Sequence, residues 1–184
     1  VVAIDAHEGP VYVGGEDALY CTSLPRPGDD ATRGGREVAI RRIQLDGERF
    51  PVEPDAVTTL VARSNLANGM TLDHDGHLVV CEQGSRSAHA AVSRIDPATG
   101  RRTTLVDAWS GLRLNSPNDV VVAADGAIWF TDPSYGHLQG FRPEPQVGDF
   151  VYRYDRTTGH LTVVADDFDK PNGLAFSPDG TVLY

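Results

Sequence analysis

Four residues with a side-chain oxygen open similar segments of the sequence and could together bind a cation. They are Glu8, Asn68, Asn118 and Asn172. One carboxylate and several amide oxygens suit a hard cation such as Ca²⁺, which takes roughly six to eight oxygen ligands. Mg²⁺, Mn²⁺ and Zn²⁺ are alternatives, because such a set of ligands would also accept these cations with little discrimination. Because asparagine at a turn often bonds its own backbone, the alternative for each position is a local structural role.

A repeated pattern indicates the elements that must hold these residues. An Asp-Gly pair lies seven and eight residues after each of the three asparagines, and a looser copy of the pattern begins at Glu8. A second pattern alternates with the first, in VSRIDPATGRRTTLV from Val92 and VYRYDRTTGHLTVVA from Val151, with a degenerate copy from Ala39. Both patterns place short apolar and β-branched runs around a glycine turn, which is typical of β-hairpins.

The spacing of the hairpins predicts the fold class. The segment starts lie 60, 50 and 54 residues apart, and four-stranded units recurring at roughly 40–50 residues are typical of β-propeller blades. We therefore predict one all-β domain over residues 1–184, a partial β-propeller. Its units are about 8–62, 68–107, 118–166 and a truncated 172–184, with larger loops at 23–37 and 134–146. An ordinary β-sandwich is the alternative, but it does not account for two hairpins recurring in the same order.

The propeller arrangement would bring the four oxygen-bearing residues together. The innermost strand of each blade lines the central channel. Residues that open these strands therefore converge from different blades on one axis, and we expect a ring of oxygen ligands at the channel mouth.

Four motifs carry a resemblance to a known family. They are EGPVY (8–12), ANGMTLDHDGHLVVCEQGSR (67–86), SPNDVVVAADGAIWFTDPSYG (116–136) and KPNGLAFSPDGTVLY (170–184). From about residue 5 to its end, the chain resembles the gluconolactonase branch of the SMP-30/gluconolactonase/LRE-like family. The resemblance implies a six-bladed β-propeller, of which this chain supplies about three to three and a half blades. It also implies one divalent metal in the channel, Ca²⁺ as the first candidate, and hydrolysis of lactones.

The resemblance also implies roles for individual residues. Glu8 and Asn172 match metal ligands of the family, and Asn118 matches a residue on the metal and substrate side. The family's remaining ligand is an Asp that also serves as the proposed general base, and it falls beyond Tyr184, so we assign no catalytic residue. Ser116 stands where animal members carry a substrate-binding Arg, so substrate recognition is not transferred.

The implied reaction is ring opening of a sugar-type lactone to the hydroxy acid. A cation polarises the lactone carbonyl, and a carboxylate or the metal itself activates the attacking water. Two alternatives remain open: a non-catalytic propeller that binds ligands or acts as a scaffold, and an esterase or phosphotriesterase using the same metal. Whether these 184 residues are active on their own stays open as well.

Further residues are candidates for binding substrate or for supporting the ligands: Asn68, Asp119, Asp132 and Tyr135. Each also has a structural alternative, such as capping a turn or bonding backbone. His7 adjoins Glu8 but would point to the opposite face if both lay on a strand. Cys21 and Cys81 share one repeat position and are expected to be buried in separate blades.

Composition restricts the partners. The net charge of −10 argues against binding to nucleic acid or to an anionic membrane, which needs a positive face. No apolar run approaches the ~20 residues that span a bilayer. We expect a small-molecule lactone as partner and a cytoplasmic location, with a periplasmic or secreted one open because the chain starts at Val1 and not at Met.

The repeat length also predicts a longer natural protein. At about 55 residues per unit, six blades would need on the order of 330 residues. A partial propeller leaves strand edges open, so self-association of two copies through these edges is the less favoured alternative.

Overall fold

The structure, a computed structural model, describes residues 4–28, 35–47 and 51–184. Three four-stranded antiparallel sheets follow one another along this part of the chain. Sheet 1 contains β1 (Val11–Val13), β2 (Ala18–Thr22), β5 (Ile40–Gln44) and β6 (Val57–Val61). Sheet 2 contains β7 (Ala67–Leu72), β8 (Leu78–Glu82), β9 (Ala91–Ile95) and β10 (Arg102–Val106). Sheet 3 contains β13 (Val120–Val122), β14 (Ile128–Asp132), β15 (Phe150–Asp155) and β16 (His160–Ala165).

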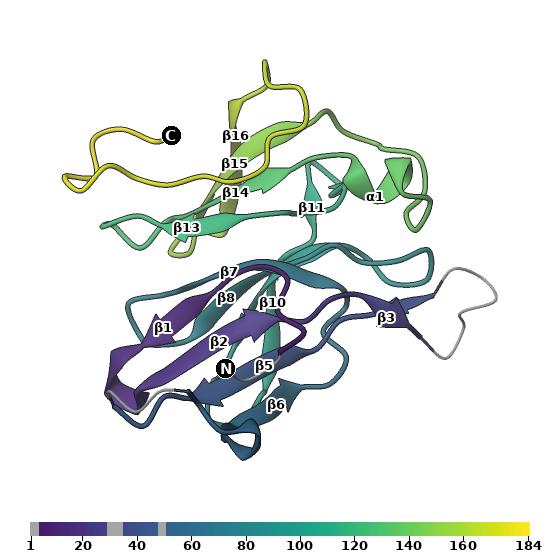
Figure 1. The fold of residues 1–184 in the computed structure, drawn as a ribbon. Coiled ribbons are helices and arrows are strands. Elements are labelled where there is room, and N and C mark those ends of the chain that lie inside the picture. The colour runs from purple at the N-terminus through teal and green to yellow at the C-terminus, as the bar shows by residue number, and fades with distance from the viewer. Residues whose placement is uncertain (1–3, 29–34, 48–50) are drawn as a thin grey trace.

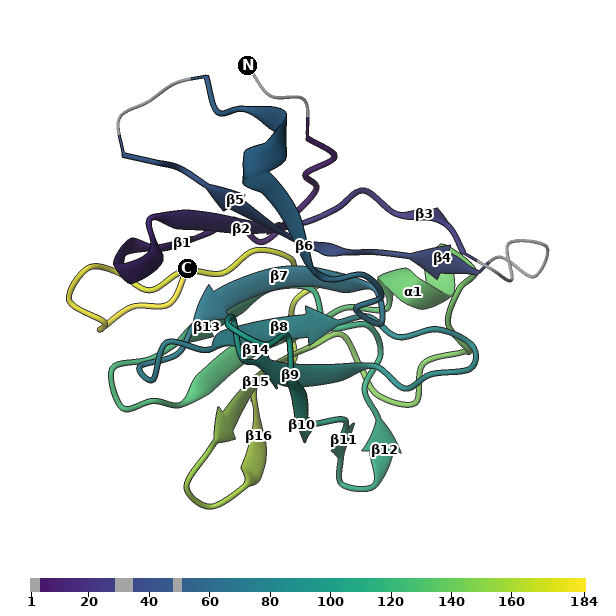
Figure 2. The same ribbon diagram turned by 90° about the horizontal axis from the view of Figure 1, so that it is seen from below.

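The strands of each sheet pair in sequence order, as in a propeller blade. The first strand of sheet 2, β7, contacts both β1 and β13, which are the first strands of the other two sheets. Both ribbon views place sheet 2 between sheets 1 and 3 (Figure 1 and Figure 2). The innermost strands therefore lie side by side, and the outer strands diverge from them.

The remaining elements are short. Two small antiparallel pairs join β3 (Arg26–Pro27) with β4 (Arg36–Glu37) and β11 (Ala108–Trp109) with β12 (Leu112–Arg113). Within the described residues, the helical turns are η1 (Gly14–Glu16), η3 (Pro54–Ala56) and α1 (Tyr135–Leu138). The larger loop expected at 23–37 thus contains the β3–β4 pair, with residues 29–34 outside the described residues, and the one at 134–146 begins with α1. The degenerate repeat from Ala39 forms β5, while its residues 48–50 also lie outside the described residues.

Glycine turns close the first hairpins of sheets 2 and 3. Gly76 and Gly126 have φ of 79° and 82°, a left-handed conformation that only glycine adopts without strain. The last segment of the chain begins a similar hairpin, since Phe176 and Leu183 form an antiparallel bridge. None of the helices in the described part of the chain has the length and apolar character needed to cross a bilayer.

Two apolar cores hold the sheets together, one on each face of sheet 2. Leu78 and Val80 of β8 belong to the core shared with sheet 1, whereas Val79 and Cys81 belong to the core shared with sheet 3. Alternate residues of a strand point to opposite faces, so an unbroken apolar run is expected for a sheet covered on both sides. Cys21 and Cys81 are free and buried, as expected from their shared repeat position.

A buried carboxylate joins sheets 2 and 3. The Asp73 side chain is fully buried and accepts hydrogen bonds from the backbone N–H groups of Asp75 and His77. It also pairs with Arg94 at 2.6 Å and with Arg156, from the β15–β16 turn, at 3.4 Å. Burial disfavours the charged form, but Arg94 and these N–H groups outweigh it and hold the pKa of Asp73 below its ordinary value.

Asp73→Ala is expected to lower the free energy of unfolding by about 3 kcal/mol, because it leaves two buried N–H groups without their acceptor and removes the buried carboxylate that pairs with Arg94 and Arg156. Of the Asp73 and Asp75 carboxylates, the two guanidinium groups would keep only the exposed one of Asp75. Urea unfolding of the full chain measures this loss. The control is Asp55→Ala at an exposed position in η3, where a change within about 0.5 kcal/mol is expected. Equal losses in the two variants would contradict a special role for Asp73.

Candidate functional site

Five of the candidate site residues line one cleft at the inner edge of the sheets. They are Glu8, Asn68, Asn118, Tyr135 and Asn172. The cleft has a volume of about 270 Å³, and we call it the inner cleft. Glu8 precedes β1, Asn68 lies at the start of β7 and Asn118 precedes β13. The structure therefore brings all four residues that open the repeats into one place.

Glycines that follow two of these residues allow the inner segments to approach closely. Gly9 has φ of 58°, and a Cβ there would lie 2.6 Å from the backbone nitrogen of Met70. The N–H of Gly69 donates to the carbonyl oxygen of Asn118 at 2.7 Å, and a Cβ on Gly69 would lie 2.6 Å from that oxygen. The Glu8, Asn68 and Asn118 segments pack backbone to backbone because no side chain separates them.

Three polar side chains of the inner cleft have no hydrogen-bond partner among the described residues. They are the Glu8 carboxylate and the amides of Asn68 and Asn118. Both asparagines are only 6% exposed. These groups face the cleft without a protein partner among the described residues, so they are available to a ligand bound there.

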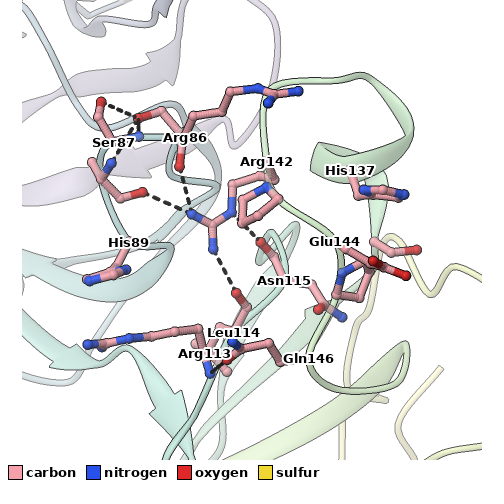
Figure 3. A pocket seen from close by; sticks show the side chains of 15 residues that line it. Arg86, Ser87, His89, Arg113, Leu114, Asn115, His137, Arg142, Glu144 and Gln146 are labelled. Carbon is pink, nitrogen blue, oxygen red and sulfur yellow. Dashed lines mark hydrogen bonds between the residues drawn. The ribbon is translucent and has the colours of Figure 1, made fainter.

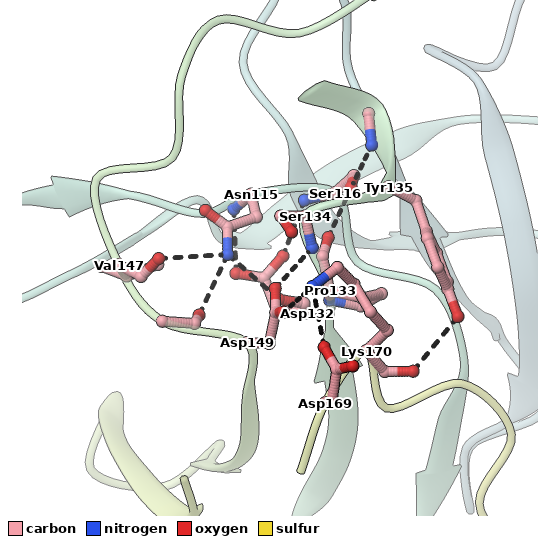
Figure 4. Close-up of polar contacts among 12 residues, drawn as sticks. Asn115, Ser116, Asp132, Pro133, Ser134, Tyr135, Val147, Asp149, Asp169 and Lys170 are labelled. Atoms are coloured by element: carbon pink, nitrogen blue, oxygen red, sulfur yellow. Dashed lines mark hydrogen bonds and ion pairs between the residues drawn. The ribbon is translucent and has the colours of Figure 1, made fainter. Parts of the chain in front are cut away.

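Asn172 is held in place by its neighbours. Its Nδ2 donates to the Tyr135 hydroxyl at 3.5 Å, and the Thr131 hydroxyl donates to its backbone carbonyl at 2.8 Å. The Tyr135 hydroxyl in turn donates to the carbonyl of Lys170 (Figure 4). The ammonium group of Lys170 bonds Asp149 and Asp169, which raise its pKa above the ordinary value. The contact to Tyr135 is long, and it leaves the Asn172 amide oxygen available.

The donor set fits a hard cation. It combines one carboxylate with three amide groups, and oxygen ligands of this kind bind Ca²⁺ or Mg²⁺. No group of three or more His, Cys, Asp or Glu within residues 4–28, 35–47 and 51–184 could hold a metal. A cation in the inner cleft would therefore depend on amide oxygens, and thiolate or multi-histidine zinc chemistry does not match these residues.

Asp119 and Asp132 lie behind the inner cleft and do not line it. Asp119 accepts hydrogen bonds from the N–H groups of Val120 and Leu174. The Asp132 carboxylate is fully buried and accepts from the N–H groups of Asn115 and Ser116, each at 2.8 Å (Figure 4). Burial raises the pKa of Asp132 to about 7, although these two N–H groups and the charge of Arg142 act in the opposite direction.

Several lining residues were missed by sequence reasoning. His7 was expected to point away from Glu8, but both line the inner cleft. That expectation applied to residues on a strand, whereas His7 and Glu8 lie outside a strand, where side chains need not alternate. Arg36 lies over the ring of Phe141 at 5.5 Å, and its two-residue strand β4 is too short to give a periodic signal. Gln83 follows β8 directly, so its place at a strand end was the one signal available.

A second pocket of about 220 Å³ is also lined by a residue of α1, His137. Buried Arg142 adjoins it and donates to the carbonyls of Leu114, Asn115, Ser85 and Ala88 (Figure 3). Its guanidinium group thus joins the β8–β9 loop to the segment that leads to Asn118. Backbone acceptors satisfy this guanidinium, so Arg142 serves the fold of the site and does not bind the ligand.

Comparison with known proteins places the chain in a family. Residues 6–184 match the SMP-30/Gluconolactonase/LRE-like region. The chain belongs to the SMP-30/gluconolactonase/LRE-like family. It is 38% identical over 120 residues to a gluconolactonase of Zymomonas mobilis, covering 64% of this chain and 32% of that protein. It is also 38% identical over 188 residues to the lactonohydrolase oryL of Aspergillus oryzae, covering 97% of this chain and 40% of that protein.

Solved structures agree with the fold. A gluconolactonase from Xanthomonas campestris superimposes with a TM-score of 0.77 at 35% identity, over 98% of this chain and 55% of that one. Regucalcin, a calcium-binding protein from Agrobacterium tumefaciens, has a TM-score of 0.61 at 20% identity, over 98% of this chain and 50% of that one, and shares the fold. The all-β fold of a partial propeller is thereby confirmed. The chain spans about half of these two structures and less of the two relatives.

Proposed function

We propose that this chain carries part of the active site of a metal-dependent lactonase. Glu8, Asn118 and Asn172 would hold a divalent cation, Ca²⁺ first, with Asn68 beside them. The observation that carries the proposal is the convergence of these oxygens in the inner cleft, where the side chains of Glu8, Asn68 and Asn118 have no partner among the described residues. Support also comes from relatives named gluconolactonase and lactonohydrolase at 38% identity.

The residues of the inner cleft have separate tasks in this proposal. When bound, the cation would polarise the lactone carbonyl and lower the pKa of water. Glu8 contributes the negative charge, and the asparagine amides contribute neutral oxygens. The amide nitrogens of Asn68 and Asn118 could donate to substrate, whereas that of Asn172 bonds Tyr135. Tyr135 keeps the Asn172 amide turned toward the cleft. We assign no general base among the described residues.

The lining of the inner cleft suits a polyhydroxylated lactone. His7, Gln83 and Gln139 add hydrogen-bonding groups, whereas Leu66 and Phe141 add apolar surface. Ligand sites commonly combine a few orienting polar groups with apolar walls. A sugar-type lactone presents hydroxyl groups to the former and the faces of its ring to the latter.

Metal content and hydrolysis measured on the same purified protein test the proposal. We expect bound Ca²⁺, hydrolysis of D-glucono-1,5-lactone that a chelator removes and Ca²⁺ restores, and slower hydrolysis of aryl esters and phosphotriesters. Faster turnover of an aryl ester or a phosphotriester would indicate an esterase or phosphotriesterase instead. Bound metal without hydrolysis of any of these compounds would favour a non-catalytic binding module.

A further inference from the structure

Each of the three sheets ends its second strand in a buried polar residue at a constant distance from a cleft residue. The separation is 14 positions in all three cases, between Glu8 and Thr22, Asn68 and Glu82, and Asn118 and Asp132. All three later side chains belong to residues that are 0% exposed. Burying a polar or charged group costs free energy unless it is hydrogen-bonded, so the contacts of these side chains are informative.

In sheet 1, Thr22 holds the backbone of Glu8 directly. The N–H of Glu8 donates to the Thr22 hydroxyl at 3.1 Å, and that hydroxyl lies 3.0 Å from the Glu8 carbonyl oxygen, to which it donates. The N–H of Thr22 donates to the same carbonyl at 3.0 Å. Glu8 lies outside the β1 ladder, so Thr22 replaces the partners that a strand would have supplied.

In sheet 3, Asp132 holds the segment that leads to Asn118. Its two carboxylate oxygens accept from the N–H groups of Asn115 and Ser116, both at 2.8 Å. The side-chain amide of Asn115 also donates to the Asp132 carbonyl at 3.1 Å. Figure 4 shows the carboxylate lying between the Asn115–Ser116 segment and the loop that begins at Pro133.

In sheet 2, Glu82 occupies the same position and contacts the segment before Asn68. The Asn65 amide donates to its carboxylate at 3.4 Å, a long contact, and Arg102 and Ser93 supply the remaining donors. Asn65 and Leu66 have φ of 54° and 58°, a left-handed backbone that costs free energy in residues other than glycine. The segment before Asn68 is therefore strained and needs external contacts to keep its shape.

We propose that Thr22, Glu82 and Asp132 are positioning residues of the cation site. Thr22 and Asp132 hold backbone groups of the segments that present Glu8 and Asn118. Glu82 contacts the side chain of Asn65, in the segment that leads to Asn68. The inference rests on the proposed cation site and adds residues that do not touch the ligand. Because Thr22 bonds Glu8 itself and Asp132 bonds two N–H groups, these two should have larger effects than Glu82.

The test measures Ca²⁺ dissociation constants of the full chain by titration calorimetry, together with the Tm of the metal-free protein. Thr22→Val keeps the side-chain shape but removes the hydroxyl, and Asp132→Asn puts an amide nitrogen against one of two N–H groups. Each is expected to weaken Ca²⁺ binding about 10-fold, the lower end of the effect of residues behind metal ligands. Thr22→Ser restores the hydroxyl and should restore the affinity.

The matched controls are Thr58→Val, on outer strand β6, and Asp125→Asn, at the hairpin turn of sheet 3. Both should bind Ca²⁺ as the wild type does. Wild-type affinity in Thr22→Val and Asp132→Asn would overturn the positioning role, even if Tm falls, and so would a failure of Thr22→Ser to restore binding. If Asp132→Asn does not fold, the Thr22 variants decide. A wild-type protein that binds no Ca²⁺ would instead overturn the cation site itself, and the positioning role with it.

Discussion

Glu8→Gln is expected to lower metal-dependent lactone hydrolysis by at least about 10³-fold, which corresponds to about 4 kcal/mol of transition-state stabilisation. A catalytic metal supplies several kcal/mol of this kind, and Glu8 is the one carboxylate among the described residues that line the inner cleft. The substitution keeps size and shape and removes the charge that would compensate a divalent cation. Initial rates on D-glucono-1,5-lactone at saturating Ca²⁺, with bound Ca²⁺ measured in parallel, give the result.

The matched control is Glu53→Gln, an exposed glutamate outside the inner cleft. It removes the same charge from a net charge of −10, so it separates the local effect of Glu8 from a change in overall charge. Tm should be unchanged in Glu8→Gln, because its carboxylate makes no hydrogen bond among the described residues. Hydrolysis and Ca²⁺ content at wild-type levels in Glu8→Gln would refute the assignment of Glu8.

Much of the fold was predictable because the repeats are local. The hairpins around Gly76 and Gly126 follow from apolar runs on both sides of an Asp-Gly turn. Helix α1 was not predicted, since four residues at the beginning of the loop at 134–146 give no helical periodicity. The β3–β4 pair was missed because two-residue strands leave no alternation to detect.

The candidate site was also predictable from the sequence only in part. Alignment of the repeats placed Glu8, Asn68, Asn118 and Asn172 in register, and a propeller brings residues in register together. Arg142 could not have been found, because it bonds carbonyls about 27 to 57 positions away along the chain. The offset of 14 positions is visible in the sequence, but the contacts of Thr22, Glu82 and Asp132 with the segments before the cleft exist only in the folded chain.

The close approach of β7 to the Asn118 segment makes Gly69 a sensitive position. A Cβ there would lie 2.6 Å from the Asn118 carbonyl oxygen and 2.7 Å from the Asp119 Cα, and it would also contact the Asp119 carboxylate. Backbone atoms cannot rotate aside, so Gly69→Ala must displace the Asn118 segment. We expect lactone hydrolysis to fall about 100-fold, the effect of a shift of about 1 Å in a reacting group, and the free energy of unfolding to fall by about 1–3 kcal/mol.

Gly15→Ala is the matched control, because a Cβ at Gly15 meets no atom within 4 Å and its backbone does not require glycine. It should leave hydrolysis, Ca²⁺ affinity and Tm unchanged. Gly69→Ala should weaken Ca²⁺ binding as well as hydrolysis, since the displaced residue is a proposed ligand and not only a substrate contact. Slower hydrolysis at wild-type Ca²⁺ affinity would indicate that Asn118 contacts the substrate and is not a metal ligand. Wild-type hydrolysis and wild-type Ca²⁺ affinity together would show that the inner strands tolerate a side chain between them.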